Sequence, residues 1–449
     1  MIGSVQLFSP ALSRLPLSNT THTKCTLTKQ GHRFLTKLAS SGGDPTATKN
    51  LIRRFVEGSP KFIALTTLSH LLSPDTTHPH LSSIALPLYA RISEASWFNW
   101  NPKIVAELAA MLDKQGRFQE SEMLISEAIS RLQSYKRELA LFHCKLIESY
   151  SKQNLERGFD DTYSYLDELL HTSSSNYIKR RVYEYMVSGL CTMGRPREAE
   201  NLVDDMRTKG LEPSAFQLRC IIYGYGRLGL FQDLERIVNQ TEEQEFVIDT
   251  VCSNMILSSY GIYGDHKNMV RWFERMRNSS IPFSIRTYNS VLNSCPTIMN
   301  KLKDLNGFPL SIKELNDCIK GDEAMVMREL VGSCKILEEV MVWDSSEAKL
   351  DLHGLHLGSC YLIMLLWLED MERKLNDLNY EIPAQVVVVC GSGKHSNVRG
   401  ESSVKGLVKE MMLKLRSPLR VDRKNSGCFV AKGKVVKDWL SKLMNRPIK

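Results

Sequence analysis

Apolar residues recur at helical spacing along much of the chain, and glycine turns interrupt them at a regular interval. Gly194, Gly229 and Gly264 stand 35 residues apart, and each lies between two amphipathic segments of roughly a dozen residues. Residues three and four apart share one face of a helix, so each pair of segments predicts two helices joined by a short loop. The clearest units cover residues 180–214, 215–249 and 250–284.

One helical hairpin cannot bury both of its apolar stripes, whereas stacked hairpins share a continuous core. The pattern therefore predicts an α-solenoid, a right-handed stack of hairpins with a concave face. Weaker units precede the clear ones at residues 111–122 and 146–165, and a further unit begins at Ile285. We expect the helical array to cover residues 44–330 and to pass into a linker at residues 331–348.

The first clear unit, RVYEYMVSGLCTMGRPREAENLVDDMRTKGLEPS, resembles a pentatricopeptide repeat over its whole length. The tetratricopeptide repeat is the nearest rival, but its period is about 34 and its Trp-Leu-Gly-Tyr pattern is missing here. In the pentatricopeptide family the fifth and last residues of a unit read one base of single-stranded RNA, so the resemblance implies RNA as the partner of the array. The candidate base-reading residues are Glu184, Ser214, Arg219, Asp249, Asn254, Ser284 and Asn289.

The candidate base-reading residues follow the family pattern unevenly. Asn254 with Ser284 resembles a familiar pair that tends towards pyrimidines, whereas the units of Glu184 and Arg219 depart from the pattern. Solenoids present concave binding surfaces without dictating the ligand. A scaffold that binds protein partners through these repeats therefore remains the alternative.

The hydrophobic period changes at Lys349, where a small α/β domain is predicted to occupy residues 349–449. Lys349–Gly354 alternates as a short strand, and Gln385–Cys390 is a continuous apolar run typical of a central parallel strand. The other expected elements are helices at Ser359–Leu378 and Ser403–Leu415 and short strands near Leu419–Val421 and Cys428–Ala431.

A strand, a helix and a second strand imply parallel neighbours whose ends lie on one edge of the sheet. His353 and the glycine loop at residues 391–400 should therefore meet. Because side chains alternate along a strand, Asp351 and His353 are expected to point to the same side, away from the core. Backbone amides of the glycine loop can bind a phosphate, and Lys394 and Arg399 would add positive charge.

The segments LDLHG and CGSGKHSNVRGESSVKGLVKEMM resemble the signature motifs of the Smr (small MutS-related) domain. The resemblance implies a nucleic-acid-binding fold similar to the C-terminal domain of a bacterial translation initiation factor, with DNA as a further candidate ligand. In several members it implies a nicking or RNA-cleaving activity. Cys390 replaces the threonine that usually opens the second motif. A P-loop is excluded, because Val388 stands where the first glycine of GxxxxGK[ST] is needed.

If the domain cleaves RNA, His353 is the candidate base for the attacking oxygen, since an imidazole titrates near neutral pH. Asp351 would orient that imidazole or hold a divalent ion such as Mg²⁺ or Mn²⁺, and Lys394 with His395 would stabilise or protonate the departing oxygen. Phosphate binding without catalysis is the alternative. The candidate phosphate-binding residues of the loop are Gly391, Gly393, Lys394, Ser396 and Arg399.

Charge is unevenly distributed over the 449 residues. The first 43 residues contain five basic and no acidic residues and are rich in serine and threonine, which predicts an organellar transit peptide at residues 1–43. We expect the chloroplast as the destination, with the mitochondrion as the alternative. Residues 349–449 contain 18 basic and 10 acidic residues. A basic domain favours nucleic-acid phosphates, although a solvated basic face would have the same composition.

Two classes of protein are disfavoured by the remaining pattern. The longest strongly apolar run, Tyr361–Leu368, is far shorter than the roughly 20 residues that span a bilayer. The 11 cysteines are scattered without a C-x-x-C pair, which favours reduced thiols over zinc sites or disulfides. The leading hypothesis is an organellar RNA-binding protein of RNA processing or expression, with an endonuclease activity of the Smr domain still open. The alternative is a non-enzymatic adaptor with a protein-binding solenoid and a nucleic-acid-binding Smr domain.

Overall fold

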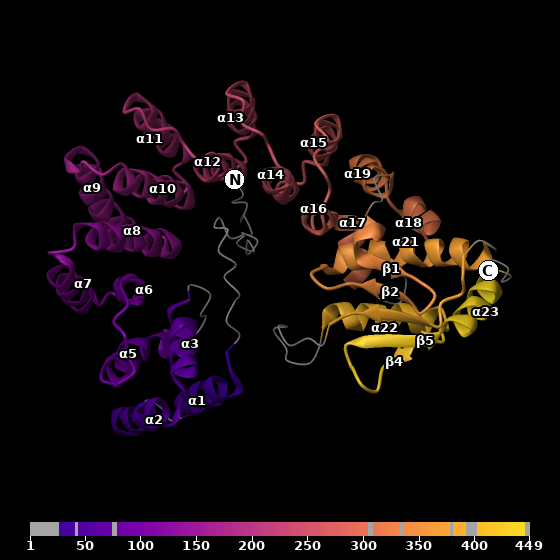
Figure 1. Ribbon diagram of the computed structural model, residues 1–449, viewed down its shortest axis with the longest axis horizontal. Coiled ribbons are helices and arrows are strands. Elements are labelled where there is room, and N and C mark those ends of the chain that lie inside the picture. Colours follow the sequence, from indigo (N-terminus) through magenta and orange to yellow (C-terminus); the bar gives the residue numbers. More distant parts are fainter. Residues whose placement is uncertain are drawn as a thin grey trace, which may run out of the picture. The chain divides into compact units, whose positions relative to one another are not determined.

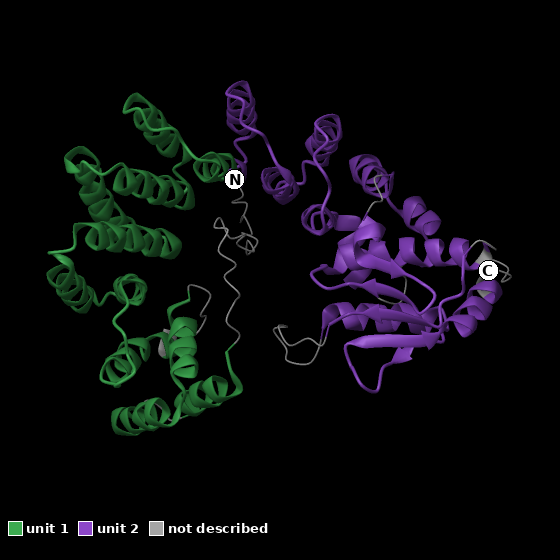
Figure 2. Cartoon of the chain, in the orientation of Figure 1, with its two compact units in different colours: residues 1–225 green, residues 226–449 purple. Residues whose placement is uncertain are grey.

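The computed structural model describes residues 27–40, 44–73, 79–303, 309–332, 336–377, 380–391 and 402–444. Helices predominate in these ranges, and the strands all belong to the C-terminal part. The chain divides into two compact units, residues 1–225 and 226–449 (Figure 2). No helix of the described residues is long and apolar enough to cross a membrane.

Unit 1 consists of helices in sequential pairs (Figure 1). Helices α6, α8 and α10 pack one against the next, and each also packs against the helix that follows it in the chain. This is the stacked-hairpin arrangement expected of a helical-repeat array. The helices are α1 (Lys29–Ser40), α2 (Pro45–Gly58), α3 (Lys61–Leu72), α4 (Pro79–Ser82), α5 (Ala85–Ser93), α6 (Pro102–Lys114), α7 (Phe118–Leu132), α8 (Lys136–Gln153), α9 (Glu156–Thr172), α10 (Asn176–Thr192) and α11 (Pro196–Thr208), with α12 (Ala215–Arg227) spanning the boundary to unit 2.

Unit 2 continues with helices and then adds a sheet. Its helices before the sheet are α13 (Phe231–Glu243), α14 (Thr250–Ile262), α15 (His266–Asn278), α16 (Ile285–Leu292), α17 (Pro296–Lys303), α18 (Ile312–Cys318), α19 (Gly321–Gly332) and α20 (Ile336–Val340). The α/β part comprises β1 (Met341–Trp343), β2 (Glu347–Asp351), α21 (Leu357–Asn376), β3 (Gln385–Val389), α22 (Ser403–Lys414), β4 (Arg420–Val421), β5 (Cys428–Lys432) and α23 (Gly433–Met444).

The three clear repeat units each contain two helices joined by a short turn, as predicted. Gly194, Gly229 and Gly264 have φ values of 78°, 69° and 67°, a left-handed conformation that glycine adopts at little cost. Asp265 caps α15, the helix after Gly264, by accepting a hydrogen bond from Asn268 N, and Asp249 caps α14 by accepting one from Cys252 N. The regular spacing of these glycines therefore reflects the left-handed backbone conformation that each turn needs.

The helical array begins earlier than predicted. Helix α1 lies inside the predicted transit peptide, yet its Phe34 ring stacks on Phe55 of α2 with centroids 3.9 Å apart, and Leu35 and Leu38 are buried. The boundary at residue 43 therefore falls after a helix that packs into unit 1. The transit peptide at residues 1–43 stays a prediction, because the packing of a helix does not locate a cleavage site. Residues 1–26 lie outside the described residues.

The sheet has the strand order β1-β2-β3-β5-β4. Strands β2 and β3 are parallel, as predicted, and the other neighbours are antiparallel. Ala348 and Leu350 of β2 are fully buried, whereas Asp351 on the opposite side is partly exposed. Helix α21 packs against both α22 and α23. The predicted alternation along β2 and the buried central strand are thus confirmed.

The predicted linker at residues 331–348 contains structure of its own. Helix α20 and strand β1 lie within it, and β1 pairs with β2 through Trp343 opposite Ala348. Helix α16 of the array packs on α21. A three-residue strand is too short for its alternation to show in the sequence, so the start of the sheet was placed too late.

Candidate functional site

Asp351 and His353 form a hydrogen-bonded pair at the end of β2. Asp351 Oδ1 lies 2.7 Å from His353 Nδ1 and also accepts the His353 backbone N–H at 3.0 Å. Both side chains reach solvent, with 42% of Asp351 and 62% of His353 exposed. The prediction that these residues face the same side is confirmed. Since a carboxylate only accepts, the bond assigns the proton to Nδ1 and leaves Nε2 as the ring atom available to a ligand.

The loop that follows β3 begins beside this imidazole. Leu352 N donates to Val389 O at 2.9 Å, which continues the β2–β3 ladder past Asp351. Gly391 has φ of 77°, and a Cβ atom at this position would lie 3.3 Å from His353 Nε2. Glycine is thus favoured here by backbone conformation and by space. The expected meeting of His353 with the start of the glycine loop is confirmed.

The other predicted loop residues lie outside the described residues: Gly393, Lys394, His395, Ser396 and Arg399. Their roles stay predictions. Cys390, which precedes the loop, is 5% exposed, and burial raises the pKa of its thiol to about 12. It is therefore a protonated packing residue at neutral pH. Among the described residues no three His, Cys, Asp or Glu side chains converge on a metal position.

Asn289 of α16 holds the turn that carries His353. Its Nδ2 donates to Gly354 O at 2.7 Å, and its Oδ1 accepts from His356 N at 2.8 Å. Asn293 adds a contact of 2.6 Å between its Nδ2 and His356 Nδ1, and partial burial lowers the pKa of His356, which favours the neutral ring that accepts this bond. The repeat register assigned Asn289 to base reading. In the structure, however, the nitrogen and the oxygen of its amide both form hydrogen bonds with the α/β domain, and only 7% of the residue is exposed.

Asn254 and Ser284 are brought together as the fifth and last residues of one repeat. Asn254 Nδ2 donates to Ser284 Oγ at 3.3 Å, and Thr287 Oγ1 donates to Asn254 Oδ1 at 2.7 Å. Ser284 also caps α16 together with Thr287. Asn254 is only 7% exposed, so the amide of the pair that best matches the family pattern is bonded within the protein, as the amide of Asn289 is.

The candidates that depart from the family pattern make local contacts. Glu184 pairs with Arg181 on the same helix. Ser214 binds the Gln217 side chain, its N–H at 2.8 Å and its Oγ at 3.0 Å from Oε1. Arg219 is half-buried on α12, and Asp249 caps α14. Readout by these four residues stays a prediction.

The β4–β5 hairpin contributes basic residues near the candidate site that the sequence did not single out. Cys390 N donates to Gly427 O at 2.8 Å, so the hairpin loop lies next to the start of the glycine loop. Arg423 and Lys424 in that loop are exposed. The sequence showed these residues only as part of the positive charge of the domain. The pairing of β5 with β3 is what places their loop near His353.

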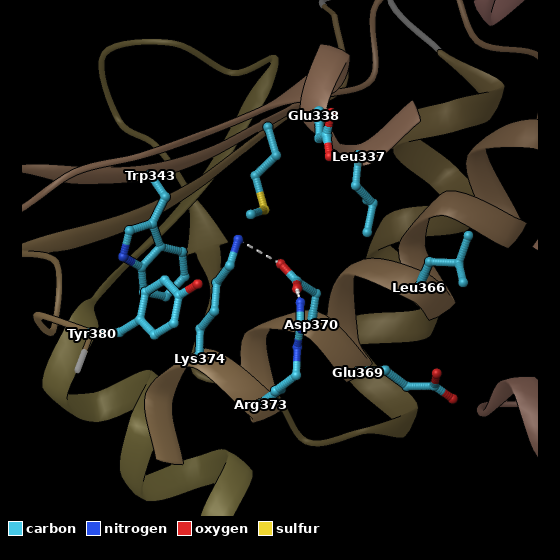
Figure 3. Close-up of a pocket in the computed structure, with 10 residues that line it drawn as sticks. Leu337, Glu338, Trp343, Leu366, Glu369, Asp370, Arg373, Lys374 and Tyr380 are labelled. Atoms are coloured by element: carbon cyan, nitrogen blue, oxygen red, sulfur yellow. Dashed lines mark hydrogen bonds and ion pairs between the residues drawn. The ribbon is translucent and has the colours of Figure 1, made fainter. Parts of the chain in front are cut away.

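A hollow of about 640 Å³ lies elsewhere in the α/β part, between β1 and α21 (Figure 3). Figure 3 shows Lys374 reaching toward Asp370, with their charged atoms 2.8 Å apart, beside the rings of Trp343 and Tyr380. Trp343 pairs with Ala348 near the start of β2, whereas Asp351 ends that strand. The hollow is therefore at the opposite end of β2 from His353, and it is lined by the ion pair of Asp370 and Lys374.

Fold and site together define a helical-repeat protein with a C-terminal α/β domain. The PPR repeat model matches residues 181–211 and 251–281, inside two of the predicted units. Pentatricopeptide repeat-containing protein At2g17033 of Arabidopsis thaliana is 52% identical over 418 residues, which cover 93% of this chain and 83% of that protein. The chain therefore belongs to the pentatricopeptide repeat protein family.

More distant relatives cover less of the chain. Pentatricopeptide repeat-containing protein At5g48730, chloroplastic, of Arabidopsis thaliana is 24% identical over 52% of this chain and 44% of that protein. Among solved structures, the pentatricopeptide repeat protein PPR10 from maize aligns with 86% of this chain and 60% of that chain, at 14% identity and a TM-score of 0.36. The family assignment rests on the first relative.

Proposed function

We propose that this protein is an organellar RNA-binding protein of RNA processing or expression, and that its α/β part is an Smr domain with RNA endonuclease activity. One observation carries the proposal: the 2.7 Å bond between Asp351 and His353 aligns an imidazole beside Gly391, where the glycine loop begins. Family membership and the basic C-terminal domain support single-stranded RNA as the ligand. DNA is a further candidate ligand of the Smr domain.

The geometry suits a general base. Asp351 accepts a hydrogen bond from His353 Nδ1–H, so His353 Nε2 carries the lone pair. In the proposed step Nε2 takes the proton of the attacking hydroxyl or water oxygen as that oxygen bonds to phosphorus. The bond from phosphorus to the leaving oxygen then breaks, and the leaving oxygen takes a proton that we assign to His395. Amides of the glycine loop and Lys394 would stabilise the charge that develops on the phosphate.

An adaptor without enzymatic activity is the second candidate. Asn289 is committed to contacts within the protein, and Glu184 and Ser214 make local contacts rather than the familiar pairing. These observations favour a repeat array that reads few bases and binds a protein partner instead. Under this alternative the Smr domain binds nucleic acid and does not cleave it.

The chloroplast is the proposed location, with the mitochondrion as the alternative. The acid-free N-terminal segment supports an organelle; two relatives carry "chloroplastic" in their names and another carries "mitochondrial".

Cleavage by the purified full-length protein tests the proposal. RNA crosslinked to the tagged protein in isolated organelles supplies the substrate, and the reaction is followed with and without Mg²⁺ or Mn²⁺. His353→Ala should lower the cleavage rate by about 10² to 10⁴ and leave RNA affinity nearly intact, because it removes a proton-transfer group. The exposed His171→Ala change is the matched control and should cleave at the wild-type rate.

Two results would contradict parts of this proposal. RNA binding without cleavage under every metal condition would establish the adaptor alternative. Cleavage at the wild-type rate by the His353→Ala protein would show that the general base is a different residue.

A further inference from the structure

Three loops meet at one edge of the sheet. Asp351 pairs with Val389, and Val389 pairs with Cys428, so the end of β2, the end of β3 and the start of β5 lie side by side. The bond from Cys390 N to Gly427 O extends this row past the strand ends. The hairpin loop at residues 422–427 therefore borders the position where the glycine loop begins and His353 stands.

The hairpin loop is ordered by its own polar groups. Asp422 Oδ1 accepts Lys424 N at 3.1 Å, and Asn425 Oδ1 accepts Gly427 N at 3.0 Å. Backbone bonds close its base, with Asp422 N donating to Cys428 O at 2.9 Å. A loop held in this way loses little further entropy when a ligand binds to it.

The basic side chains of this hairpin differ in whether they are free to bind a ligand. Arg420 donates to the carbonyl oxygens of Ser417 at 2.6 Å and Leu419 at 3.0 Å, so its guanidinium holds the chain after α22. Arg423 and Lys424 are exposed, and within the described part of the chain neither forms an ion pair. Two unpaired cations thus stand on an ordered loop beside the candidate site.

We propose that the hairpin loop at residues 422–427 is a phosphate-binding wall of the site, with Arg423 and Lys424 contacting the backbone phosphates of a single RNA strand that lies across His353. The inference rests on the proposed RNA binding and extends it to residues that the Smr resemblance did not supply. The loop contains no aromatic side chain, so it contributes charge and position, not base recognition. It does not depend on whether His353 is a base.

The salt dependence of RNA binding by the full-length protein tests the wall. Arg423→Gln with Lys424→Gln removes two phosphate contacts, and the slope of log affinity against log salt should become shallower by about 1.4, at about 0.7 per phosphate of a single strand. The charge-preserving Arg423→Lys with Lys424→Arg protein should keep the wild-type slope. Thermal unfolding of each variant verifies the fold.

The matched control removes the same charge from the far end of β5. Lys432 is the last residue of β5 and pairs with Gln385 at the start of β3, and Lys434 follows it in the first turn of α23; both are exposed. Lys432→Gln with Lys434→Gln should keep the wild-type slope. If the slope of log affinity against log salt became equally shallow in both double variants, the phosphate-binding role of the hairpin loop would be refuted, while the proposed RNA binding would not be affected. Absence of RNA binding by the wild-type protein would overturn both.

Discussion

Asn289 shows how one residue can match a sequence pattern and serve a different purpose. Its place in the repeat register predicts contact with a base, yet its partners are Gly354 O and His356 N, 65 and 67 residues away in the chain. A buried amide with two good protein partners is satisfied without a ligand. We regard Asn289 as a positioning residue of the turn that carries His353.

Replacing Asn289 by Ala should lower the free energy of unfolding of unit 2 by about 1 to 3 kcal/mol, because two hydrogen bonds are lost and two backbone groups lose a partner. Chemical denaturation followed by circular dichroism measures the change. Asn278→Ala, at an exposed position at the end of α15, is the control and should change stability by less than about 0.5 kcal/mol. Equal stability of both variants would refute the positioning role.

His143 on α8 should make unit 1 sensitive to acid. Its ring stacks on Tyr165 with centroids 3.8 Å apart, and burial lowers its pKa to about 4. The unfolded value is about 6.5, so between these values the unfolded chain binds a proton that the folded chain excludes. The free energy of unfolding should therefore fall by about 2 to 3 kcal/mol between pH 7.5 and 4.5 through this group.

Denaturation of wild-type and His143→Phe proteins at both pH values isolates this contribution. The Phe variant keeps an aromatic ring but has no proton to bind, so the loss attributed to His143 should disappear. His171→Gln, an exposed histidine of the same unit, should follow the wild type. An unchanged pH dependence in the Phe variant would show that other groups cause it.

At the scale of elements, the last helices of the array pack directly against the α/β part. Tyr361 of α21 donates its hydroxyl to Pro309 O at 2.6 Å, and a Cβ atom on Gly358 would lie 3.1 Å from Leu292 Cβ. Helices α16, α17, α18 and α20 all pack on α21. A fragment that starts after these helices would expose the apolar surface that they cover.

A protein fragment of residues 249–449 should therefore fold and melt cooperatively, whereas residues 345–449 should show a lower melting temperature or aggregate. The longer fragment retains Asp249 as the cap of α14, together with α16 to α20 and β1. Thermal unfolding and size-exclusion chromatography compare the two. Equal melting temperatures would show that the α/β part is independent of the array.

At the scale of the whole molecule, the charge distribution separates three parts of the chain. Residues 1–43 carry a formal charge of +5 and residues 349–449 of +8, within a total of +8, so the residues between them carry −5. The basic N-terminal part supports import, and the basic C-terminal part supports phosphate binding. Helix α1 lies within the first of these parts and packs on α2 through the rings of Phe34 and Phe55.

A fusion of residues 1–50 to a fluorescent protein should enter plastids. A matched fusion of residues 27–50, which keeps α1 but lacks the first 26 residues, should stay in the cytosol. Confocal microscopy with plastid and mitochondrial markers distinguishes the outcomes. Cytosolic fluorescence of the longer fusion would contradict the transit peptide, and mitochondrial fluorescence would select the alternative organelle.

Local features of this protein could be predicted from its sequence. Gly194, Gly229 and Gly264 marked the turns of the repeats, and the alternation in LDLHG placed Asp351 and His353 together. Both predictions depend on neighbours within a few residues, where helical and strand periodicity act directly. The parallel pairing of β2 with β3 followed from a general rule of chain connection.

Only the tertiary structure decided which distant residues complete the site and where the folded parts begin. Phe34 reaches Phe55 to add α1 to the array, and Met341 pairs with Leu350 to start the sheet. Asn289 donates a hydrogen bond to Gly354 O, and Gly427 O of the β4–β5 hairpin accepts one from Cys390 N. Each contact joins segments whose individual patterns do not encode the partner, because packing selects among many compatible pairings by the surface buried when the whole unit forms.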